Sequence, residues 1–582
     1  MLHTILIQST LMPRPLLHTA PLQTNIRRKA AHARRAAFPL PIIPPRKKEI
    51  IMPKDTASIF YNGPIITLED APAPEALLAE NRKIKALGSL SQLQAAAPYA
   101  RLIDLKGRAL LPAFIDTHSH FFQVAMSLLQ ISLAKADSLE EVISLIQEGI
   151  RRQQPGPGQW ILVRDFDQSR IPGGRCPTLA QLDEAAPNHP MIIQHQSGHM
   201  GFFNSAALSR LQVTPRTPVP EGGIIEQCRG ALTGYMEENA FFQYQKKVPL
   251  PPENQVIQAF LQAQEIYASH GITTIQDGML VEEMLPFYQL LSDKKLLKLD
   301  LAAYSGTASW PAVKRTLPRH LGQYQNRLKI AGLKIFLDGS PQGRTAWMRR
   351  PYIGTDFCGY PTMTDQAVLE AFALAARENT QILAHVNGDG AAAQYLRCLK
   401  EAEEAFPALK TLRPVIIHGQ LMGLDQLPLA ARLEAVISFF VAHVYYWGDT
   451  HIENLGMERA AQISPASSAL KTGIPVTFHQ DSPVIQPDML ETIWCAVCRI
   501  TRSGTVLGKE EALPPLEALK SVTIRAAWQY GEENQKGSLA PGKYADLVIL
   551  SQNPLAIAPE KIPSIQVLET YKEGRCIWSS SS

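Results

Sequence analysis

The sequence lacks any hydrophobic run long enough to cross a lipid bilayer. A membrane-spanning helix needs about 20 consecutive apolar residues, and no uninterrupted apolar stretch among the 582 residues approaches that length. We therefore predict no transmembrane segment and no membrane partner. Hydrophobic residues still make up 45% of the chain and charged residues 19%, which is typical of a globular protein. A chain of this length is expected to contain more than one structural unit.

Cysteine is scarce, and its spacing is irregular. The chain has seven cysteines, an odd number without the regular spacing of a disulfide framework. Cys495 and Cys498 form a CxxC, but the surrounding IWCAVCRI reads as a helix and no second CxxC follows. Reduced, buried thiols explain this pattern better than a redox pair or a zinc pair. We therefore expect a reducing compartment, namely the cytoplasm.

Acidic residues are absent from the first 48 residues, which contain nine Lys and Arg, and Glu49 is the first acid. Because the whole chain has a net charge of +4, the part that follows Glu49 carries −4. Such a mildly acidic body gives no basis for nucleic-acid binding by bulk attraction. We expect no nucleic-acid partner.

The basic lead has two interpretations. It is either a transit-type segment, because it lacks acids, or a translated stretch ahead of a later true start, because Met52 immediately precedes strand-like patterning. We favour the second interpretation. In both cases residues 1–51 are predicted to stay outside the fold, as a disordered or non-native extension.

Two motifs of common hydrolases are also missing. The sequence contains neither the G-x-S-x-G of serine hydrolases nor the G-x-x-x-x-G-K-[ST] loop that holds nucleotide phosphates. It therefore favours neither an acyl-serine enzyme nor a nucleotide hydrolase.

The pattern of apolar runs predicts the domain organisation. Short strands broken by Gly, Pro and Asn fill residues 52–112 and return over residues 526–582, and we predict that both segments form one small β domain. Over residues 113–525, eight short apolar runs alternate with helix-like stretches, which predicts an α/β fold, a (β/α)₈ TIM-like barrel. Residues from about 121 to 265 are too long for one βα connection and predict an inserted subdomain.

Metal-competent side chains stand near the ends of these apolar runs. His118 and His120 in LLPAFIDTHSHF lie on one face of a strand end, because strand side chains alternate between faces. A buried, hydrogen-bonded histidine is the usual alternative for each one taken singly. Four later runs each contribute a comparable group, which favours one shared metal site at the C-terminal strand ends. The predicted ligands are His118, His120, Lys334, His385, His418 and Asp481.

Lys334 is the most diagnostic of these positions. Burial lowers the pKa of a lysine ammonium, and the neutral amine can capture carbon dioxide to form a carbamate. A carbamate presents two oxygens, as a carboxylate does, and could bridge two cations. The alternative is a structural ion pair between Lys334 and Asp338 or another acid. The accompanying histidines favour carbamylation.

Asp481 is predicted to transfer protons. A carboxylate beside a metal can take the proton of the attacking water and hand it to the leaving group, while the metal lowers the pKa of that water to about 7. The alternative is a turn or helix-cap aspartate, because Ser482-Pro483 follows. His479 lies on the same face and is predicted to support a ligand from behind.

These motifs resemble the amidohydrolase superfamily, in the branch of YtcJ-like and N-substituted formamide deformylase-like enzymes (the amidohydrolase 3 group). IDTHSHF matches the HxH element, LKIFLDGSPQGRTAW the carbamylated-lysine strand and its loop, and AHVNGDGA and IHGQ the two single-histidine strands. SGHMGFFNSAAL resembles a segment typical of the branch, and GSLAPGKYADLVIL the return into the small β domain. The resemblance covers residues 55–582.

The resemblance implies the activity and its cofactors. It implies a (β/α)₈ barrel with a composite β-sandwich, one or two divalent metal ions, most often zinc, and carbon dioxide for the carbamylation of Lys334. The six ligands named above carry over, with Asp481 as proton shuttle. We expect hydrolysis of a non-peptide carbon–nitrogen bond in a small molecule, and a homodimer. The implied substrate-side residues are Ser197, His199, Ser340, Gln342, Arg344, His443 and Trp447.

The reaction and the metal stay open, because other activities would use the same framework and the sequence departs from the family motifs at several positions. An ester or lactone hydrolase, a deaminase with unmodified Lys334, or a catalytically silent binding protein would use the same framework. Ala113 stands where the family usually has Gly, and His479-Gln480 stand where Gly-Ser is commoner. IHGQ lacks the acid that often precedes the histidine. None of these changes removes a ligand. The donor types also admit manganese, nickel or iron.

Overall fold

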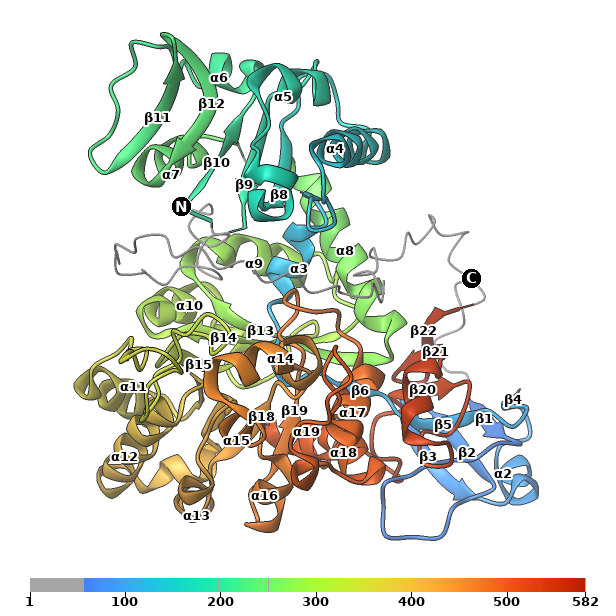
Figure 1. Ribbon diagram of the computed structural model, residues 1–582. Coiled ribbons are helices and arrows are strands. Elements are labelled where there is room, and N and C mark those ends of the chain that lie inside the picture. The colour runs from blue at the N-terminus through green and yellow to red at the C-terminus, as the bar shows by residue number, and fades with distance from the viewer. Residues whose placement is uncertain (1–56, 197, 250, 581–582) are drawn as a thin grey trace. The chain divides into compact units, whose positions relative to one another are not determined.

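The structure, a computed structural model, describes residues 57–196, 198–249 and 251–580 (Figure 1). The predicted extension over residues 1–51 and the predicted substrate-side residue Ser197 lie outside the described residues. No helix in the described part of the chain is long and apolar enough to cross a membrane.

The chain divides into two compact units, which we describe separately. Among the described residues, the first unit contains residues 125–259 and the second contains residues 57–124 together with 260–580. The domain boundaries drawn from the sequence, including the insertion over 121–265, stay predictions.

The second unit is built around an eight-stranded sheet with the order β19-β18-β17-β16-β15-β14-β13-β6. Every neighbouring pair is parallel, which confirms the predicted TIM-like barrel. Parallel strands covered by helices are buried on both faces, and all residues of β14, β17, β18 and β19 are buried. The strands are β6 (Phe114–Ile115), β13 (Ile272–Leu280), β14 (Asp300–Gly306), β15 (Leu328–Phe336), β16 (Gln381–Val386), β17 (Val415–His418), β18 (Val436–Phe439) and β19 (Val476–Phe478).

The two ends of this sheet meet at the segments that follow β6 and β19. The Asp481 N–H donates to the His118 carbonyl over 3.2 Å, and the His120 N–H donates to the Ser482 carbonyl over 2.8 Å. These bonds close the barrel at its C-terminal end, where the predicted ligands lie. Helices accompany the strands: α8 (Glu253–Ser269), α9 (Leu285–Asp293), α10 (Trp310–Thr316), α11 (Asp365–Arg377), α12 (Asp389–Ala405), α13 (Leu427–Arg432), α14 (His443–Leu455), α15 (Met457–Ala460), α16 (Ala466–Lys471), α17 (Met489–Cys498), α18 (Pro515–Ser521) and α19 (Ile524–Gln529).

The apolar run LLPAFIDTHSH spans two sheets. Its first residues belong to β5 (Ala109–Pro112), and Phe114 and Ile115 form β6. Strand β5 pairs with β20 (Leu547–Leu550) in the small β domain. The Ala113 N–H still bonds the Asp546 carbonyl over 2.9 Å, and the next residue enters the barrel. A continuous apolar run does not show where a strand changes sheets, because both sheets bury it.

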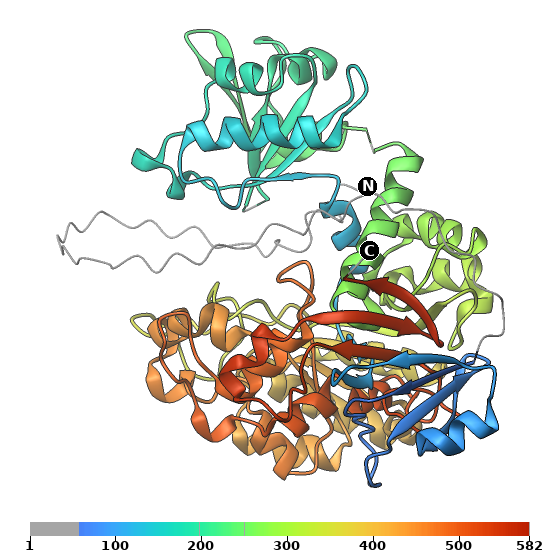
Figure 2. The same cartoon turned by 90° about the vertical axis from the view of Figure 1, so that its right-hand side faces the viewer.

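The N- and C-terminal segments build two small four-stranded sheets, with the orders β3-β2-β1-β4 and β22-β21-β20-β5. Figure 2 shows the blue N-terminal strands beside the red C-terminal ones. Their apolar faces share one core, in which the rings of Phe60 and Tyr571 lie 5.2 Å apart. The prediction of a composite β domain is thus confirmed. Its remaining elements are β1 (Ser58–Tyr61), β2 (Ala76–Glu80), β3 (Lys83–Gly88), α2 (Leu90–Ala96), β4 (Arg101–Asp104), β21 (Val567–Lys572) and β22 (Arg575–Ser579).

The first unit contains a six-stranded mixed sheet with the order β11-β12-β10-β9-β8-β7. Its longest helix, α4, begins after Ser138, whose hydroxyl accepts from the Glu141 N–H over 3.1 Å, and it carries two arginines in its last turn. Both features complement the exposed groups and the dipole of a helix. The elements are β7 (Ile131–Ser132), α4 (Leu139–Gln153), β8 (Ile161–Phe166), α5 (Leu179–Ala185), β9 (Met191–His195), β10 (Met200–Phe203), α6 (Ser205–Arg210), β11 (Gly223–Cys228), β12 (Ala231–Glu237) and α7 (Glu238–Gln245), with α3 (Phe121–Ser127) at the border of the units.

Cysteine burial only partly follows the expectation. None of the seven cysteines, all of which lie in the described part of the chain, forms a disulfide; Cys495 on α17 is buried, whereas Cys176, Cys228 and Cys576 are exposed. The helix predicted around the CxxC is confirmed.

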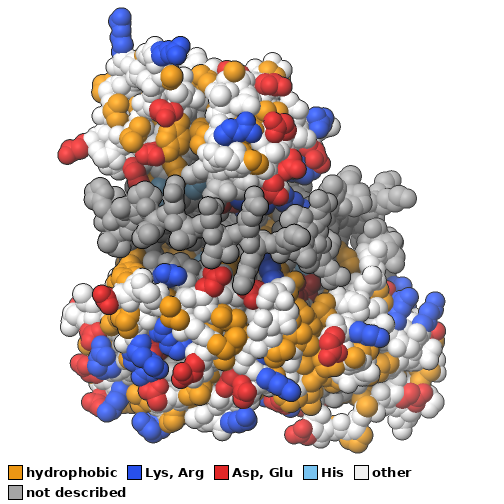
Figure 3. Space-filling view, in the orientation of Figure 1, with side chains coloured by type: hydrophobic (Ala, Val, Ile, Leu, Met, Phe, Trp, Pro, Cys, Tyr) orange, Lys and Arg blue, Asp and Glu red, His pale blue; other side chains and the backbone are white. Residues whose placement is uncertain are grey.

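On the surface seen in Figure 3, acidic and basic side chains of the second unit are intermixed.

Candidate metal centre

The barrel brings the six predicted ligands to the C-terminal ends of its strands. His118 and His120 follow β6, and Asp481 follows β19. His418 is the last residue of β17, and His385 lies one residue before the end of β16. Lys334 lies within β15, two residues before its end, and is 1% exposed.

The side-chain tips of these residues converge. Asp481 Oδ1 lies 3.4 Å from His118 Nε2 and 3.3 Å from His120 Nε2, and Asp481 Oδ2 lies 4.0 Å from His418 Nε2. His118, His418 and Asp481 each offer one atom within 4.8 Å of the others, close enough to hold one cation. The six positions, separated by up to 363 residues in the chain, therefore surround one point. Their roles as ligands stay a prediction.

The remaining two positions extend the cluster. Lys334 Nζ lies 3.3 Å from His118 Nε2, and His385 Nδ1 lies 3.0 Å from His418 Nε2. Asp338, the alternative ion-pair partner of Lys334, instead accepts from the backbone N–H groups of Trp347, Asn387 and Gly388. No ion pair joins Lys334 and Asp338 within the described residues.

The neighbours of His118 fix which of its nitrogens faces the cluster. Gln276 Nε2 donates to the Thr117 carbonyl over 2.6 Å and to the Tyr530 hydroxyl over 2.9 Å. Its oxygen therefore accepts, and His118 Nδ1, 2.7 Å away, must carry a proton. The Nε2 lone pair of His118 is left pointing toward Asp481 and Lys334, as a ligand requires.

Burial dominates the electrostatics of the cluster. Burial lowers the pKa of the Lys334 ammonium to about 7, although the charge of Asp481 opposes the shift. Burial also lowers the pKa of His118 and His418 well below the usual value. Burial would raise the pKa of Asp481, but the nearby imidazoles of His120, His118 and His418 outweigh burial and hold that pKa well below its usual range. The cluster thus offers neutral imidazoles and an ionised carboxylate, the donor set that divalent cations bind.

A buried oxygen atom of Asp481 that lacks a hydrogen-bond partner also indicates that this cluster fits a cation. Asp481 Oδ1 is buried and has no hydrogen-bond partner among the described residues, although two imidazole nitrogens lie within 3.4 Å. Buried polar atoms in folded proteins nearly always have partners. A cation held between these atoms would supply one.

The predicted substrate-side residues fall into two groups. His199 belongs to the first unit, where its Nδ1 lies 3.0 Å from Glu238 Oε2. The others belong to the second unit. Ser340, Gln342 and Arg344 follow β15 in one loop, and Arg344 Nε donates to Asn454 Oδ1 over 2.7 Å.

His443 and Trp447 open helix α14 and lie beside the cluster. Their ring centroids are 4.5 Å apart, and that of His443 is 4.7 Å from Phe440. Phe440 in turn contacts His418, with ring centroids 6.3 Å apart. The three rings form an aromatic surface that adjoins the cluster. Phe440 was not among the predicted residues.

Several polar residues behind the ligands escaped the sequence analysis. Gln276 orients His118, Asn387 Nδ2 lies 2.9 Å from His385 Nε2, and Ser438 Oγ lies 2.8 Å from His479 Nδ1. Each is a polar residue within or directly after a buried apolar strand. That signal was readable, but it does not reveal which ligand each residue supports.

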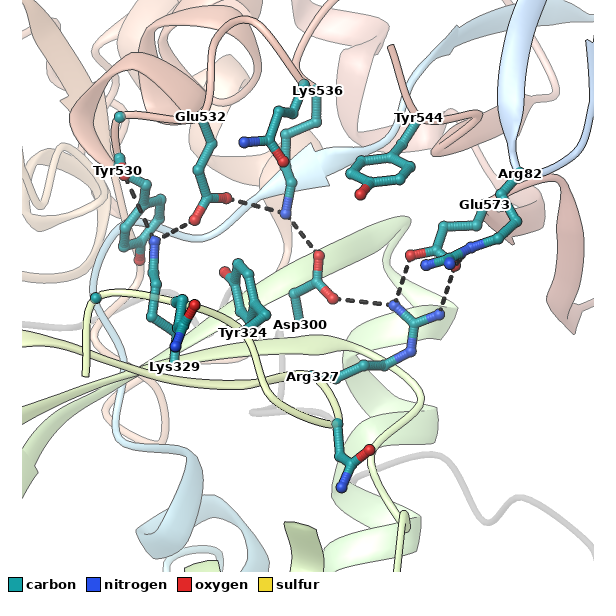
Figure 4. A pocket seen from close by; sticks show the side chains of 15 residues that line it. Arg82, Asp300, Tyr324, Arg327, Lys329, Tyr530, Glu532, Lys536, Tyr544 and Glu573 are labelled. Atoms are coloured by element: carbon teal, nitrogen blue, oxygen red, sulfur yellow. Dashed lines mark hydrogen bonds and ion pairs between the residues drawn. The ribbon is translucent and has the colours of Figure 1, made fainter. Parts of the chain in front are cut away.

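The structure also contains a charged cavity of about 550 Å³ at the opposite, N-terminal end of the strands (Figure 4). Asp300 begins β14, and Arg327 directly precedes β15. Catalytic groups of TIM barrels lie at the other end. The charges here are paired with one another, as between Arg327 Nη1 and Asp300 Oδ1 at 3.0 Å. We interpret this cavity as part of the structural framework.

A parallel eight-stranded barrel with a His, His and Asp cluster at its C-terminal strand ends defines the class of metal-dependent hydrolases. The sequence model of the amidohydrolase family matches residues 101–578, and the chain therefore belongs to this family. The resemblance inferred from the motifs is confirmed.

Individual relatives agree with this assignment. YtcJ of Bacillus subtilis strain 168, named as an amidohydrolase, is 26% identical over 90% of this chain and 100% of its own length. The N-substituted formamide deformylase of Arthrobacter pascens is 26% identical over 86% of this chain and 94% of its length. The crystal structure of an uncharacterized metal-dependent hydrolase from Pyrococcus horikoshii OT3 is 25% identical, with a TM-score of 0.71 over 87% of this chain and 99% of that chain.

Proposed function

We propose that this protein hydrolyses a non-peptide carbon–nitrogen bond, of the amide or formamide type, in a small molecule. The observation that carries the proposal is the convergence of His118, His418 and Asp481 within 4.8 Å at the catalytic end of the barrel. The formamide deformylase among the relatives supports the bond type. His120, Lys334 and His385 complete the proposed ligand set, and zinc is the proposed metal.

The residues divide the chemistry between them. A bound divalent cation would lower the pKa of a water to about 7 and polarise the scissile carbonyl. Asp481 begins ionised, because its pKa lies well below the usual range, so its carboxylate can accept the proton of the attacking water. It then returns that proton to the leaving nitrogen, which departs as a neutral amine. His118, His120, His385 and His418 would hold the cation.

Lys334 is proposed to act as a carbamate. Its pKa of about 7 leaves much of the amine neutral at neutral pH. The Nζ lone pair attacks carbon dioxide, a nitrogen–carbon bond forms, and one proton leaves to solvent. The product is an anion with two oxygens in place of a cation, which suits a site for one or two metal ions.

The aromatic surface of Phe440, His443 and Trp447 is proposed to contact the substrate. Ser340, Gln342 and Arg344 are proposed substrate contacts from the loop after β15. A cytoplasmic location, supported by seven cysteines of which none forms a disulfide, and a homodimer complete the proposal.

Substitution of Lys334 tests the proposal. We expect Lys334→Ala to abolish hydrolysis and to reduce bound metal, because the carbamate bridge is lost; metal analysis and product analysis measure both. Lys400→Ala, on the exposed side of α12, is the matched control. Full retention of metal and activity by Lys334→Ala would refute the proposal.

The bond type is tested separately by product analysis over a panel of N-acyl, formamide, ester and aminopurine compounds. Amine and carboxylic acid products from the amides support the proposal. Turnover confined to esters would assign an ester or lactone hydrolase, and ammonia from the aminopurines a deaminase. A metal-free protein inactive on the whole panel would assign a binding protein.

A further inference from the structure

A line of hydrogen bonds runs from His418 through the wall of the barrel. His418 Nδ1 lies 3.1 Å from His479 Nε2, and His479 Nδ1 lies 2.8 Å from Ser438 Oγ. Ser438 Oγ lies 2.9 Å from Thr117 Oγ1, which lies 2.9 Å from the Phe478 carbonyl oxygen. The four side chains come from the ends of β17, β19, β18 and β6, and the line therefore crosses the closure of the barrel.

The end of this line determines the direction of every bond in it. A carbonyl oxygen only accepts, so the Thr117 hydroxyl must donate to Phe478. Thr117 Oγ1 has no second proton, and Ser438 must therefore donate to it. With its own proton used, Ser438 Oγ can only accept from His479, and His479 Nδ1 carries a proton.

The same reasoning reaches the metal cluster. A neutral imidazole carries one proton, so His479 Nε2 accepts from His418 Nδ1. His479 is completely buried, and burial disfavours the doubly protonated imidazolium. His418 therefore carries its proton on Nδ1, and its Nε2 lone pair faces Asp481 and His385.

We propose that His479, Ser438 and Thr117 form a relay that fixes the tautomer of His418 and keeps its Nε2 lone pair available to a metal ion. His479 is thus a positioning residue. The relay rests on the proposed metal site.

Burial of the four side chains keeps the direction of these hydrogen bonds fixed. Thr117, Ser438 and His479 are each 0% exposed, and His418 is 3% exposed. Water could otherwise supply a donor or an acceptor at any link and reverse the bonds. Gln276 acts on His118 in the same way but through a single bond. Two candidate ligands, His118 after β6 and His418 on β17, are therefore held in the same tautomer, with Nδ1 protonated.

The first experiment uses a matched pair at the far end of the relay. Thr117→Val keeps the shape of the side chain but removes its hydroxyl, so Ser438 is free to donate to His479 and reverse the line. Thr117→Ser keeps the hydroxyl. We expect the zinc dissociation constant, measured by competition with a chromophoric chelator, to rise about 10- to 100-fold in Thr117→Val. Thr117→Ser should bind zinc as the unsubstituted protein does.

A second variant and two further measurements distinguish loss of the relay from loss of folding. Ser438→Ala breaks the middle of the line and should weaken zinc binding to a similar extent, while thermal unfolding of the metal-free proteins checks that each variant is folded. Nitrogen-15 shifts of the His418 ring in the metal-free protein, assigned with a His418→Gln variant, report the tautomer directly. We expect a protonated Nδ1 and an unprotonated Nε2.

The outcomes separate the relay from the proposed function. Zinc binding that is lost in His418→Gln but unchanged in both Thr117→Val and Ser438→Ala would overturn the relay and leave the metal site standing. A protonated Nε2 on His418 in the unsubstituted metal-free protein would also overturn the relay. A folded protein that binds no zinc, nor any other divalent metal, would overturn both.

Discussion

At the scale of single residues, the position of the candidate ligand His118 depends on a neighbour without a side chain, Gly278. A Cβ placed on Gly278 would lie 2.3 Å from His118 Cε1 and 2.8 Å from its Nδ1. Real carbon atoms do not approach so closely, so any side chain there would displace the ring. Gly278 lies two residues after Gln276 on β13, so one strand supplies both the hydrogen-bond partner of His118 and the space for its ring.

This close approach gives a sharp prediction. Gly278→Ala should raise the zinc dissociation constant and lower kcat/KM by about 10-fold or more, because it shifts a ligand and its bond to Gln276. Chelator competition and steady-state kinetics measure the two effects. Gly156→Ala is the control, since a Cβ there meets nothing closer than 3.8 Å. Unchanged zinc affinity in Gly278→Ala would contradict the assignment of His118 as a ligand.

At the scale of secondary-structure elements, ion pairs join the small β domain to the N-terminal end of the barrel. Glu573, in the turn between β21 and β22, accepts from Arg82 over 2.6 Å and from Arg327 over 2.9 and 3.1 Å. Lys536 and Lys572 each lie 2.6 Å from Asp300 Oδ2. Figure 4 shows how the labelled charges alternate along this contact.

Glu573 should make the fold sensitive to acid. Burial would raise its pKa, but hydrogen bonds from Arg82 and Arg327 outweigh burial and lower the pKa from 4.5 to about 2. The folded state therefore binds fewer protons than the unfolded state between these values. The stability from the ion pairs is complete above pH 4.5 and is lost as the pH falls toward 2.

Glu573→Gln tests this interpretation. It should lower the free energy of unfolding at pH 7 by on the order of 3 kcal/mol, and the difference from the unsubstituted protein should vanish near pH 2. Urea unfolding at a series of pH values measures it. Glu401→Gln, at an exposed position of α12, controls for the loss of a charge. A constant difference across the pH range would show that Glu573 contributes by packing alone.

At the scale of the whole second unit, a metal ion would connect segments that are far apart in the chain. The candidate ligands extend from His118 to Asp481 and lie within or directly after five strands of the sheet, namely β6, β15, β16, β17 and β19. Because the unfolded chain cannot assemble this site, the free energy of metal binding adds to the stability of the fold.

Removal of the metal should therefore destabilise the protein. After chelation, we expect a lower unfolding temperature by calorimetry, and a return to the original value when zinc is added back. A zinc concentration 100 times the dissociation constant should restore about 2.7 kcal/mol. His418→Gln should respond much less to zinc. An unfolding temperature that changes with neither chelator nor zinc would exclude a metal from this cluster.

The sequence determined the barrel, the composite β domain and the set of residues that meet at the metal cluster. It could do so because hydrophobic periodicity is local, and because each candidate ligand from His118 to Asp481 stands near the end of an apolar run whose direction is fixed by the parallel sheet. The motifs of the amidohydrolase family indicated the same barrel and the same candidate ligands independently of the hydrophobic pattern.

Only the tertiary structure decided how the candidate ligands are oriented. Gln276 orients His118, Gly278 leaves room for its ring, and Thr117 and Ser438 reach His418 through His479. The structure also showed that the run before His118 is divided between two sheets, and that Phe440 adjoins the cluster. These contacts join residues up to 321 positions apart. Their hydrogen bonds depend on distances and donor directions that exist only once the barrel has closed.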